Sequence, residues 1–336
     1  MADPIRNIPL ALNQPLRFKP IFKEKIWGGK RMGALLGKAT GHLPNCGESW
    51  EISGVTGDVS DLADGSGNLQ QLLVTYQDLL TGKRVYKRHG DEFPLLIKFL
   101  DADEDLSVQV HPNDAQARER HNCLGKTEMW YILSAEKDAE LVVGFEHDTQ
   151  PATYVAAVES GKVMDLLHRE KVQPGDVLYI PAGRIHTIGK GIVLAEIQQS
   201  SDITYRIYDF DRTDAAGNKR DLHTEQATDV LDFKSYPAYK AVYTDQLNLP
   251  VFLAGGEYFH THKLWLNQDM HRNLLALDTL VIYISIAGSC RISAGNGSIV
   301  LEKGQSCLVP ACIADVQLQP NGECVLLETY VPAYHA

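Results

Sequence analysis

An internal repeat constrains the fold of this chain more than any other feature of the sequence. The stretch VQPGDVLYIPAGRIHTIGKGIVLAEIQ, residues 172–198, resembles LEKGQSCLVPACIADVQLQPNGECVLLET, residues 301–329. Both contain a glycine, five residues and a proline, at Gly175 and Pro181 and again at Gly304 and Pro310. The upstream segments EMWYILSAEKDAELVVGF and LVIYISIAGSCRISAGNG also match in pattern. Two similar units in one chain predict two related domains.

The secondary structure predicted for these units is mainly strand. Short runs rich in Val, Ile and Tyr, such as GDVLYIPAG and LVIYISIAG, are separated by Gly and Pro, as in sandwiches and jelly rolls. Helical spacing of apolar residues is limited to 68–82 and, more weakly, to 153–168, which Gly161 interrupts. A short helix over 113–120 is expected, with Asn113 or Asp114 as its cap. We expect two jelly-roll barrels with a few peripheral helices, divided into residues 1–235 and 236–336.

Composition excludes several classes of partner. The chain has 32 Lys and Arg against 43 Asp and Glu, a net charge of −11, which argues against binding to nucleic acid or to an anionic membrane. An anionic substrate would need a locally basic pocket. No apolar run is long enough for a transmembrane helix, and the N-terminus lacks the pattern of a signal peptide. We therefore expect a cytoplasmic protein, either a monomer or a weak homo-oligomer.

The segment GDVLYIPAGRIH carries the first functional motif. It fits the pattern G-x5-P-x-G-x2-H and thereby resembles the second signature of the cupin superfamily, so the two barrels are expected to be of the cupin type. The first cupin signature is H-x-H, three or four residues, then Glu. Here the corresponding residues are Gln109 and His111, a 16-residue excursion, and then Glu128. The signature is therefore stretched, with Gln in place of the first His.

Strand periodicity places several of these polar residues on one surface. Residues i and i+2 of a strand point to the same face, so Ser107, Gln109 and His111 share a face. Lys98 has the opposite parity, which predicts a bulge or break within DADED, residues 101–105. For Gln109 and His111 alone, a polar strand face that bonds to its neighbours would be the simpler interpretation.

Four separated segments together resemble one family. LIKFLDADEDLSVQVHPND, GKTEMWYIL, PAGRIHTIG and SSDITYR occur in the order found in type I mannose-6-phosphate isomerases, and the length is similar to that of the short bacterial form. The resemblance covers most of residues 16–210 and continues to the end as a degenerate cupin. It implies a zinc-dependent isomerase that interconverts mannose 6-phosphate and fructose 6-phosphate through an enediol(ate).

The resemblance also implies a set of site residues. One zinc ion per chain would be bound by Gln109, His111, Glu128 and His186, a mixed N/O set that suits zinc. Glu196 is the implied base, with Arg206 as a second essential residue and Lys126 as a further catalytic candidate. An alternative for Glu196 is a structural carboxylate paired with a nearby cation.

Recognition of the sugar phosphate requires positive charge and hydrogen-bond donors. The candidates lie in the matched segments: Ser107, Lys98, Lys126 and Arg206. Lys98 interrupts the apolar strand FPLLIKFL, and an unpaired buried ammonium is costly, so it could instead be an edge lysine or a partner of Glu48 or Glu51. Trp27 and Glu48 resemble residues that line the pocket, although core packing explains them equally well.

Two other functions share these features. An iron-dependent cupin oxygenase would use His111, Glu128 and His186 as a facial triad, and a sugar-phosphate-binding bicupin would bind without catalysis. The second copy has Asp315 and Cys312 as its only candidates near the position of His186, so we expect no metal site there. The remaining histidines, including His89, His121, His168 and His223, are expected at the surface.

Overall fold

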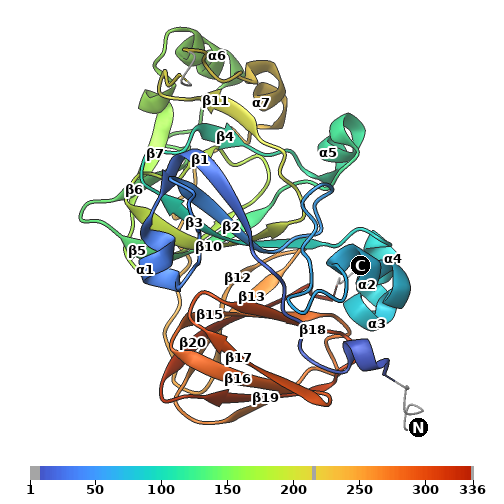
Figure 1. Cartoon of the computed structure of the whole chain (residues 1–336). Coiled ribbons are helices and arrows are strands. Elements are labelled where there is room, and N and C mark those ends of the chain that lie inside the picture. The colour runs from blue at the N-terminus through green and yellow to red at the C-terminus, as the bar shows by residue number, and fades with distance from the viewer. Residues whose placement is uncertain (1–7, 214–216, 334–336) are drawn as a thin grey trace.

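The computed structural model describes residues 8–213 and 217–333, which form two pairs of facing β-sheets (Figure 1). The first pair consists of a six-stranded and a five-stranded sheet. The six-stranded sheet contains, in order, β1 Ile21–Gly29, β2 Cys46–Ile52, β3 Leu95–Ala102, β10 Ile192–Gln199, β5 Glu128–Ala135 and β8 Val177–Ile180. The five-stranded sheet contains, in order, β11 Tyr205–Tyr208, β4 Val108–Val110, β9 His186–Thr187, β6 Glu140–Phe145 and β7 Leu167–Lys171. The mainly β architecture predicted from the sequence is confirmed.

The second pair follows in the chain and lies below the first in Figure 1. Its five-stranded sheet contains, in order, β12 Pro250–Gly255, β13 His260–Leu266, β20 Cys324–Tyr330, β15 Val281–Ala287 and β18 Ser306–Val309. Its four-stranded sheet contains, in order, β14 Met270–Asn273, β19 Asp315–Pro320, β16 Ser289–Ala294 and β17 Gly297–Glu302. In the described part of the chain each pair is a cupin-type sandwich of two sheets, and not one continuous closed barrel.

Alternation along the strands divides the six-stranded sheet into two buried faces. Leu100, Trp130 and Leu194 point into the first sandwich, whereas Phe99 and Ala195 point outward and pack with residues of the second pair. One apolar core therefore joins the two pairs, which bury the backs of their sheets against each other. This explains why β3, β5 and β10 are buried along nearly their whole length.

Helices lie at the periphery, as expected from the sequence. They are η1 Leu10–Leu12, α1 Arg31–Leu36, α2 Leu69–Tyr76, α3 Asp78–Thr81, α4 Lys83–His89, α5 Asp114–His121, α6 Pro151–Glu159, η2 Val163–Leu166 and α7 Thr224–Val230. No helix in the described ranges is long and apolar enough to cross a membrane.

The helix expected over residues 68–82 is wrong as a single element. Gln77, with φ of 49°, ends α2 and starts the separate α3, because this backbone conformation breaks the helical hydrogen-bond pattern. Asn68 starts α2 with a capping box, and Asn113 does the same for α5. Gly161, with φ of 69°, separates α6 from η2, as the sequence predicted, but the expected helix does not extend to residue 168, because β7 begins at Leu167.

The repeat is visible as equivalent turns. Gly175 and Gly304 adopt φ of 94° and 84° and precede β8 and β18, which occupy equivalent edge positions in their sheets. The break predicted within residues 101–105 is also present, because β3 ends at Ala102 and β4 begins at Val108 in the other sheet. The domain boundary at residue 235 stays a prediction.

Candidate active site and metal centre

Three of the four predicted metal ligands lie on or beside neighbouring strands. Gln109 of β4 pairs directly with His186 of β9, and His111 follows the end of β4. Glu128, the first residue of β5, approaches them from the facing sheet. The stretched motif therefore converges because β4 and β5 belong to opposite sheets of one sandwich.

The convergence is close enough for one metal ion. Glu128 Oε1 lies 3.3 Å from His186 Nε2, and Glu128 Oε2 lies 3.7 Å from His111 Nε2. One ligand atom from each of the three residues lies within 4.8 Å of the others. Among the described residues this is the only such group of at least three His, Cys, Asp or Glu side chains.

Backbone carbonyls select the tautomer of both imidazoles. His111 Nδ1 lies 2.8 Å from Ile203 O, and His186 Nδ1 lies 2.8 Å from Arg184 O. Because a carbonyl oxygen only accepts, each Nδ1 carries the proton and each Nε2 presents its lone pair to Glu128. This arrangement is the one that metal-binding histidines require.

The protonation states also suit a cation. Burial lowers the pKa of His186 to about 3 and holds the pKa of His111 well below its usual range, so both rings are neutral. Burial raises the pKa of Glu128 to about 7, against the attraction of Lys126. Apart from the ion pair with Lys126 at 2.7 Å, neither oxygen of Glu128 accepts a hydrogen bond from the described residues. The residues present therefore fit a divalent metal ion.

Gln109 lies beside this group without completing it. Its Nε2 is 3.3 Å from His186 Nε2. A metal would bind the amide oxygen, and turning the amide by half a rotation exchanges the two atoms. Gln109 as fourth ligand remains a prediction.

A cavity of about 490 Å³ opens above these residues. This is within the size range of small-molecule sites. The predicted site residues that line it are Trp27, Glu48, Lys98, Ser107, Gln109, Lys126, Glu196 and Arg206. His111, Glu128 and His186 lie beneath its floor, since Lys126 contacts both His111, at 3.0 Å, and Glu128.

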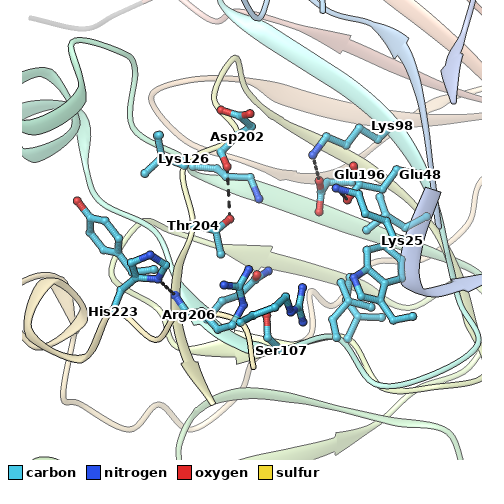
Figure 2. A pocket seen from close by; sticks show the side chains of 18 of the residues that line it. Lys25, Glu48, Lys98, Ser107, Lys126, Glu196, Asp202, Thr204, Arg206 and His223 are labelled. Carbon is cyan, nitrogen blue, oxygen red and sulfur yellow. Dashed lines mark hydrogen bonds and ion pairs between the residues drawn. The ribbon is translucent and has the colours of Figure 1, made fainter. Parts of the chain in front are cut away.

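One wall of the cavity carries paired charges (Figure 2). Lys98 Nζ lies 3.2 Å from Glu196 Oε1, and Trp130 Nε1 donates to Glu196 Oε2 at 2.9 Å. Burial alone would raise the pKa of Glu196, but Lys98 and Lys126 outweigh it and the pKa is lowered. The nearby cation that the alternative interpretation of Glu196 required is thus present, and it keeps the carboxylate ionised.

Glu48 continues this wall. It lies 3.3 Å from Lys25 and accepts a 2.6 Å hydrogen bond from Trp50 Nε1. Lys98, against the opposing effect of burial, is the main cause of its lowered pKa. Two partners were suggested for Lys98. Glu48 is close enough for Lys98 to lower its pKa, whereas Glu51 pairs with Lys38 at 2.6 Å.

The opposite part of the cavity carries arginines. Arg206 and Arg220 both line it, and Arg206 Nε is buried without a hydrogen-bond partner among the described residues. Burial, followed by the nearby Arg220, lowers the pKa of Arg206. Asp209 is buried and accepts hydrogen bonds from Arg220, at 2.7 Å to Nε, and from Arg212, at 2.6 Å. One carboxylate thus holds two guanidinium groups, and the cluster favours an anion.

Sequence reasoning missed several residues of this cavity. Lys25, Arg220, His121 and His223 all line it. His121 is exposed, as expected, whereas His223 is only partly exposed. His223 Nδ1 accepts a hydrogen bond from the backbone N–H of Arg206, which fixes the start of the arginine cluster (Figure 2). Lys25 lies two residues before the predicted Trp27, whereas the segment of Arg220 and His223 carries no motif and reaches the cavity only through the fold.

The second sheet pair keeps a carboxylate where the first has Glu196. Glu196 pairs with Trp130 in β5, and Glu328 pairs with Tyr283 in the equivalent β15. Tyr283 donates to Glu328 at 2.9 Å, and Arg272 binds it through two hydrogen bonds of 2.9 and 2.6 Å. A guanidinium thus neutralises this carboxylate, which agrees with the metal-binding group being found in the first pair.

Comparison with known proteins adds a family context to this geometry. Residues 16–157 match the family described as phosphomannose isomerase type I, catalytic domain, and residues 249–329 match the mannose-6-phosphate isomerase cupin domain. The chain is 37% identical to mannose-6-phosphate isomerase ManA of Bacillus subtilis, over 93% of this chain and 98% of that protein. It is 36% identical to mannose-6-phosphate isomerase of Streptococcus mutans, over 93% of this chain and 97% of that protein.

Solved structures agree with the sequence comparison. The crystal structure of mannose 6-phosphate isomerase from Bacillus subtilis superposes with a TM-score of 0.84 at 32% identity, covering 94% of this chain and 99% of that one. A protein from Archaeoglobus fulgidus, described as a putative mannosephosphate isomerase, gives a TM-score of 0.79 at 20% identity, over 97% and 100% of the two chains. The second match supports the fold alone.

Proposed function

The chain belongs to the type I phosphomannose isomerase family and is an isomerase, and from this premise we propose that it interconverts mannose 6-phosphate and fructose 6-phosphate with the help of one zinc ion. One observation carries the proposal. A single cavity has a metal-binding group beneath its floor and two arginines, Arg206 and Arg220, on its wall. The two features match the reacting end and the phosphate end of a sugar phosphate.

The metal would be held by His111, Glu128 and His186, with Gln109 as the proposed fourth ligand. When bound, zinc supplies Lewis-acid stabilisation of the sugar oxygens. The fit rests on the two Nε2 lone pairs and on the buried carboxylate of Glu128, whose one close cation among the described residues is Lys126. Mixed N/O ligands also accept manganese, cobalt or iron, so the metal must be identified by analysis.

Proton transfer is assigned to Glu196. Isomerisation of an aldose to a ketose through an enediol(ate) needs a base that removes the proton from C2 and returns it to C1. Glu196 is ionised, is oriented by Trp130 and lines the cavity. Lys126, whose pKa is raised by Glu128 and Glu196 against the effect of burial, can donate a hydrogen bond to a sugar oxygen. Arg206 lines the same cavity, and its buried Nε has no hydrogen-bond partner among the described residues.

Phosphate binding is assigned to the arginine side of the cavity. Arg206 and Ser107 lie near each other on this side (Figure 2). Arg220 also lines the cavity, and guanidinium forks suit phosphate oxygens. Lys98 was predicted among the phosphate ligands, but it lies on the other side and pairs with Glu196. We therefore assign Lys98 to the sugar end, beside Trp27 and Glu48, which also line the cavity.

Two experiments test the proposal. Metal-stripped protein is assayed for isomerisation of mannose 6-phosphate before and after zinc is added back, and activity that returns with zinc supports it. Incubation with mannose 6-phosphate in deuterium oxide then shows whether label enters at C2, which a binding protein without catalytic activity cannot achieve. Iron in the purified protein together with oxygen uptake would instead identify the oxygenase. A cytoplasmic location and a monomer or weak homo-oligomer stay predictions.

A further inference from the structure

The metal ligands His111 and Glu128 are separated by an excursion of 16 residues, yet their ligand atoms lie 3.7 Å apart. A long connection does not by itself fix the distance between its ends, because each added residue adds conformational freedom. Some contact outside the ligands must therefore hold the two ends of the excursion together. The residues that do so surround Gln199, the last residue of β10.

Gln199 is buried and binds both ends of the excursion. Its side-chain oxygen accepts a 2.9 Å hydrogen bond from the backbone N–H of Thr127, the residue before Glu128. Its side-chain amide donates at 2.7 Å to Asp114 Oδ1, close after His111. Its backbone N–H also donates to Thr127 O at 3.1 Å. One side chain thus connects the segments that carry two ligands.

The same junction is closed directly between the two ends. Asp114 Oδ1 also accepts a 2.9 Å hydrogen bond from the backbone N–H of Gly125, and the N–H of Lys126 donates to Pro112 O at 3.1 Å. A Cβ placed on Gly125 would lie 2.6 Å from the backbone carbon of Asn113. The backbones are therefore in contact, and only glycine fits between them.

Thr127 extends the connection to the third ligand. Its hydroxyl accepts a 3.2 Å hydrogen bond from the backbone N–H of Ala182, in the turn that leads to His186. In the same turn, the N–H of Gly183 donates to His111 O at 2.9 Å. The segments that carry His111, Glu128 and His186 are thus tied together by hydrogen bonds that do not involve the ligand side chains.

We propose that Gln199 and Thr127 are positioning residues that set the spacing of the three metal ligands and thereby the affinity for the metal. This inference rests on the proposed function, since it requires that a metal is bound. Neither residue touches the ligand atoms, so each acts through the backbone of the ligand segments. Partners of this kind outside the ligand set typically account for about 10-fold to 100-fold in metal affinity.

The test compares zinc affinity, measured by competition with a chromophoric chelator, in full-length variants. Gln199→Met keeps the length of the side chain but removes both hydrogen bonds, and Thr127→Val removes the acceptor for Ala182 at nearly constant volume. We expect each to weaken zinc binding by about 10-fold or more. Thr127→Ser keeps the hydroxyl and should bind zinc with the affinity of the wild-type protein. Thr261→Val is the matched control, because Thr261 is buried and bonds Thr329 at 2.6 Å in the second sheet pair.

The outcomes separate the two proposals. A merely structural role would lower the melting temperature of the metal-free variants, as in the control, and leave zinc affinity unchanged, which would reject the positioning role. Absence of zinc binding by the wild-type protein would reject the metal-dependent function and the positioning role together. If Gln199→Met does not fold, the contrast between Thr127→Val and Thr127→Ser decides the question alone.

Discussion

Lys98 and Glu196 lie opposite each other on the paired strands β3 and β10, with their charged atoms 3.2 Å apart and both side chains buried. The ammonium that interrupts an apolar strand is therefore compensated within the cavity wall. Because the ion pair lowers the pKa of Glu196, it also fixes the protonation state of the proposed base.

Lys98→Met is expected to move the acidic limb of the kcat profile to higher pH. Glu196 accepts a proton only when it is ionised, that is, above its pKa, and Lys98 keeps that pKa low. Without Lys98, the effect of burial prevails and the pKa of Glu196 rises. We expect a rise of about one to two pH units. The pH dependence of kcat for mannose 6-phosphate measures the shift. An unmoved acidic limb would show that Glu196 is not the titrating base.

Arg220→Gln is expected to raise KM for the sugar phosphate more than it lowers kcat. Hydrogen bonds to charged groups contribute about 1.5–3 kcal/mol, so KM should rise by roughly 10-fold to 100-fold. Weaker competitive inhibition by inorganic phosphate should accompany it. Arg291→Gln, at an exposed arginine of β16, provides the control. An equal rise in KM in both variants would refute the assignment of Arg220 to the phosphate end of the cavity.

His186→Ala is expected to abolish zinc binding and isomerase activity together. The imidazole is fully buried, its Nε2 faces Glu128, and no other described histidine is close enough to replace it. Metal analysis of the dialysed protein and the isomerase assay provide the two readouts. His271→Ala, at an exposed histidine of the second sheet pair, should leave both unchanged. Full activity of His186→Ala would refute the site.

Ile284→Ala is expected to destabilise the whole chain and not the second sheet pair alone. Ile284 is fully buried in the core that joins the two pairs, and such a truncation costs about 2–5 kcal/mol. Calorimetry should show one unfolding transition at a lower temperature. Two transitions, of which only one moves, would mean that the pairs fold independently.

The strand pattern could be predicted from the sequence because it depends on local spacing, whereas the grouping of His111, Glu128 and His186 was expected from the family resemblance. His186 follows a glycine–proline turn that is read directly from residues 175–186, and the parity of Gln109 and His111 follows from strand geometry. The break at Gln77 was missed because glutamine is an ordinary helix residue, so its type gives no sign of the φ of 49°.

Other parts of the site had no local signal. Arg220 and His223 are ordinary polar residues beyond the matched motifs, and they reach the cavity only because their segment folds back beside β11. The carboxylate of Glu328 was overlooked because its partners Arg272 and Tyr283 come from two other strands. Contacts of this kind are set by strand order, which spacing along the chain does not contain.

The sequence by itself determined the mainly β class, the repeat and the residue types of the metal group, since these follow from periodicity and side-chain chemistry. Only the tertiary structure decided that Lys98 forms an ion pair with Glu196 and that Arg206 and Arg220 line the same cavity. It also decided that Gln199 binds both ends of the excursion between His111 and Glu128. Each of these relationships joins residues from different strands or loops. Their distances depend on how two sheets face each other and on a core shared with the second pair.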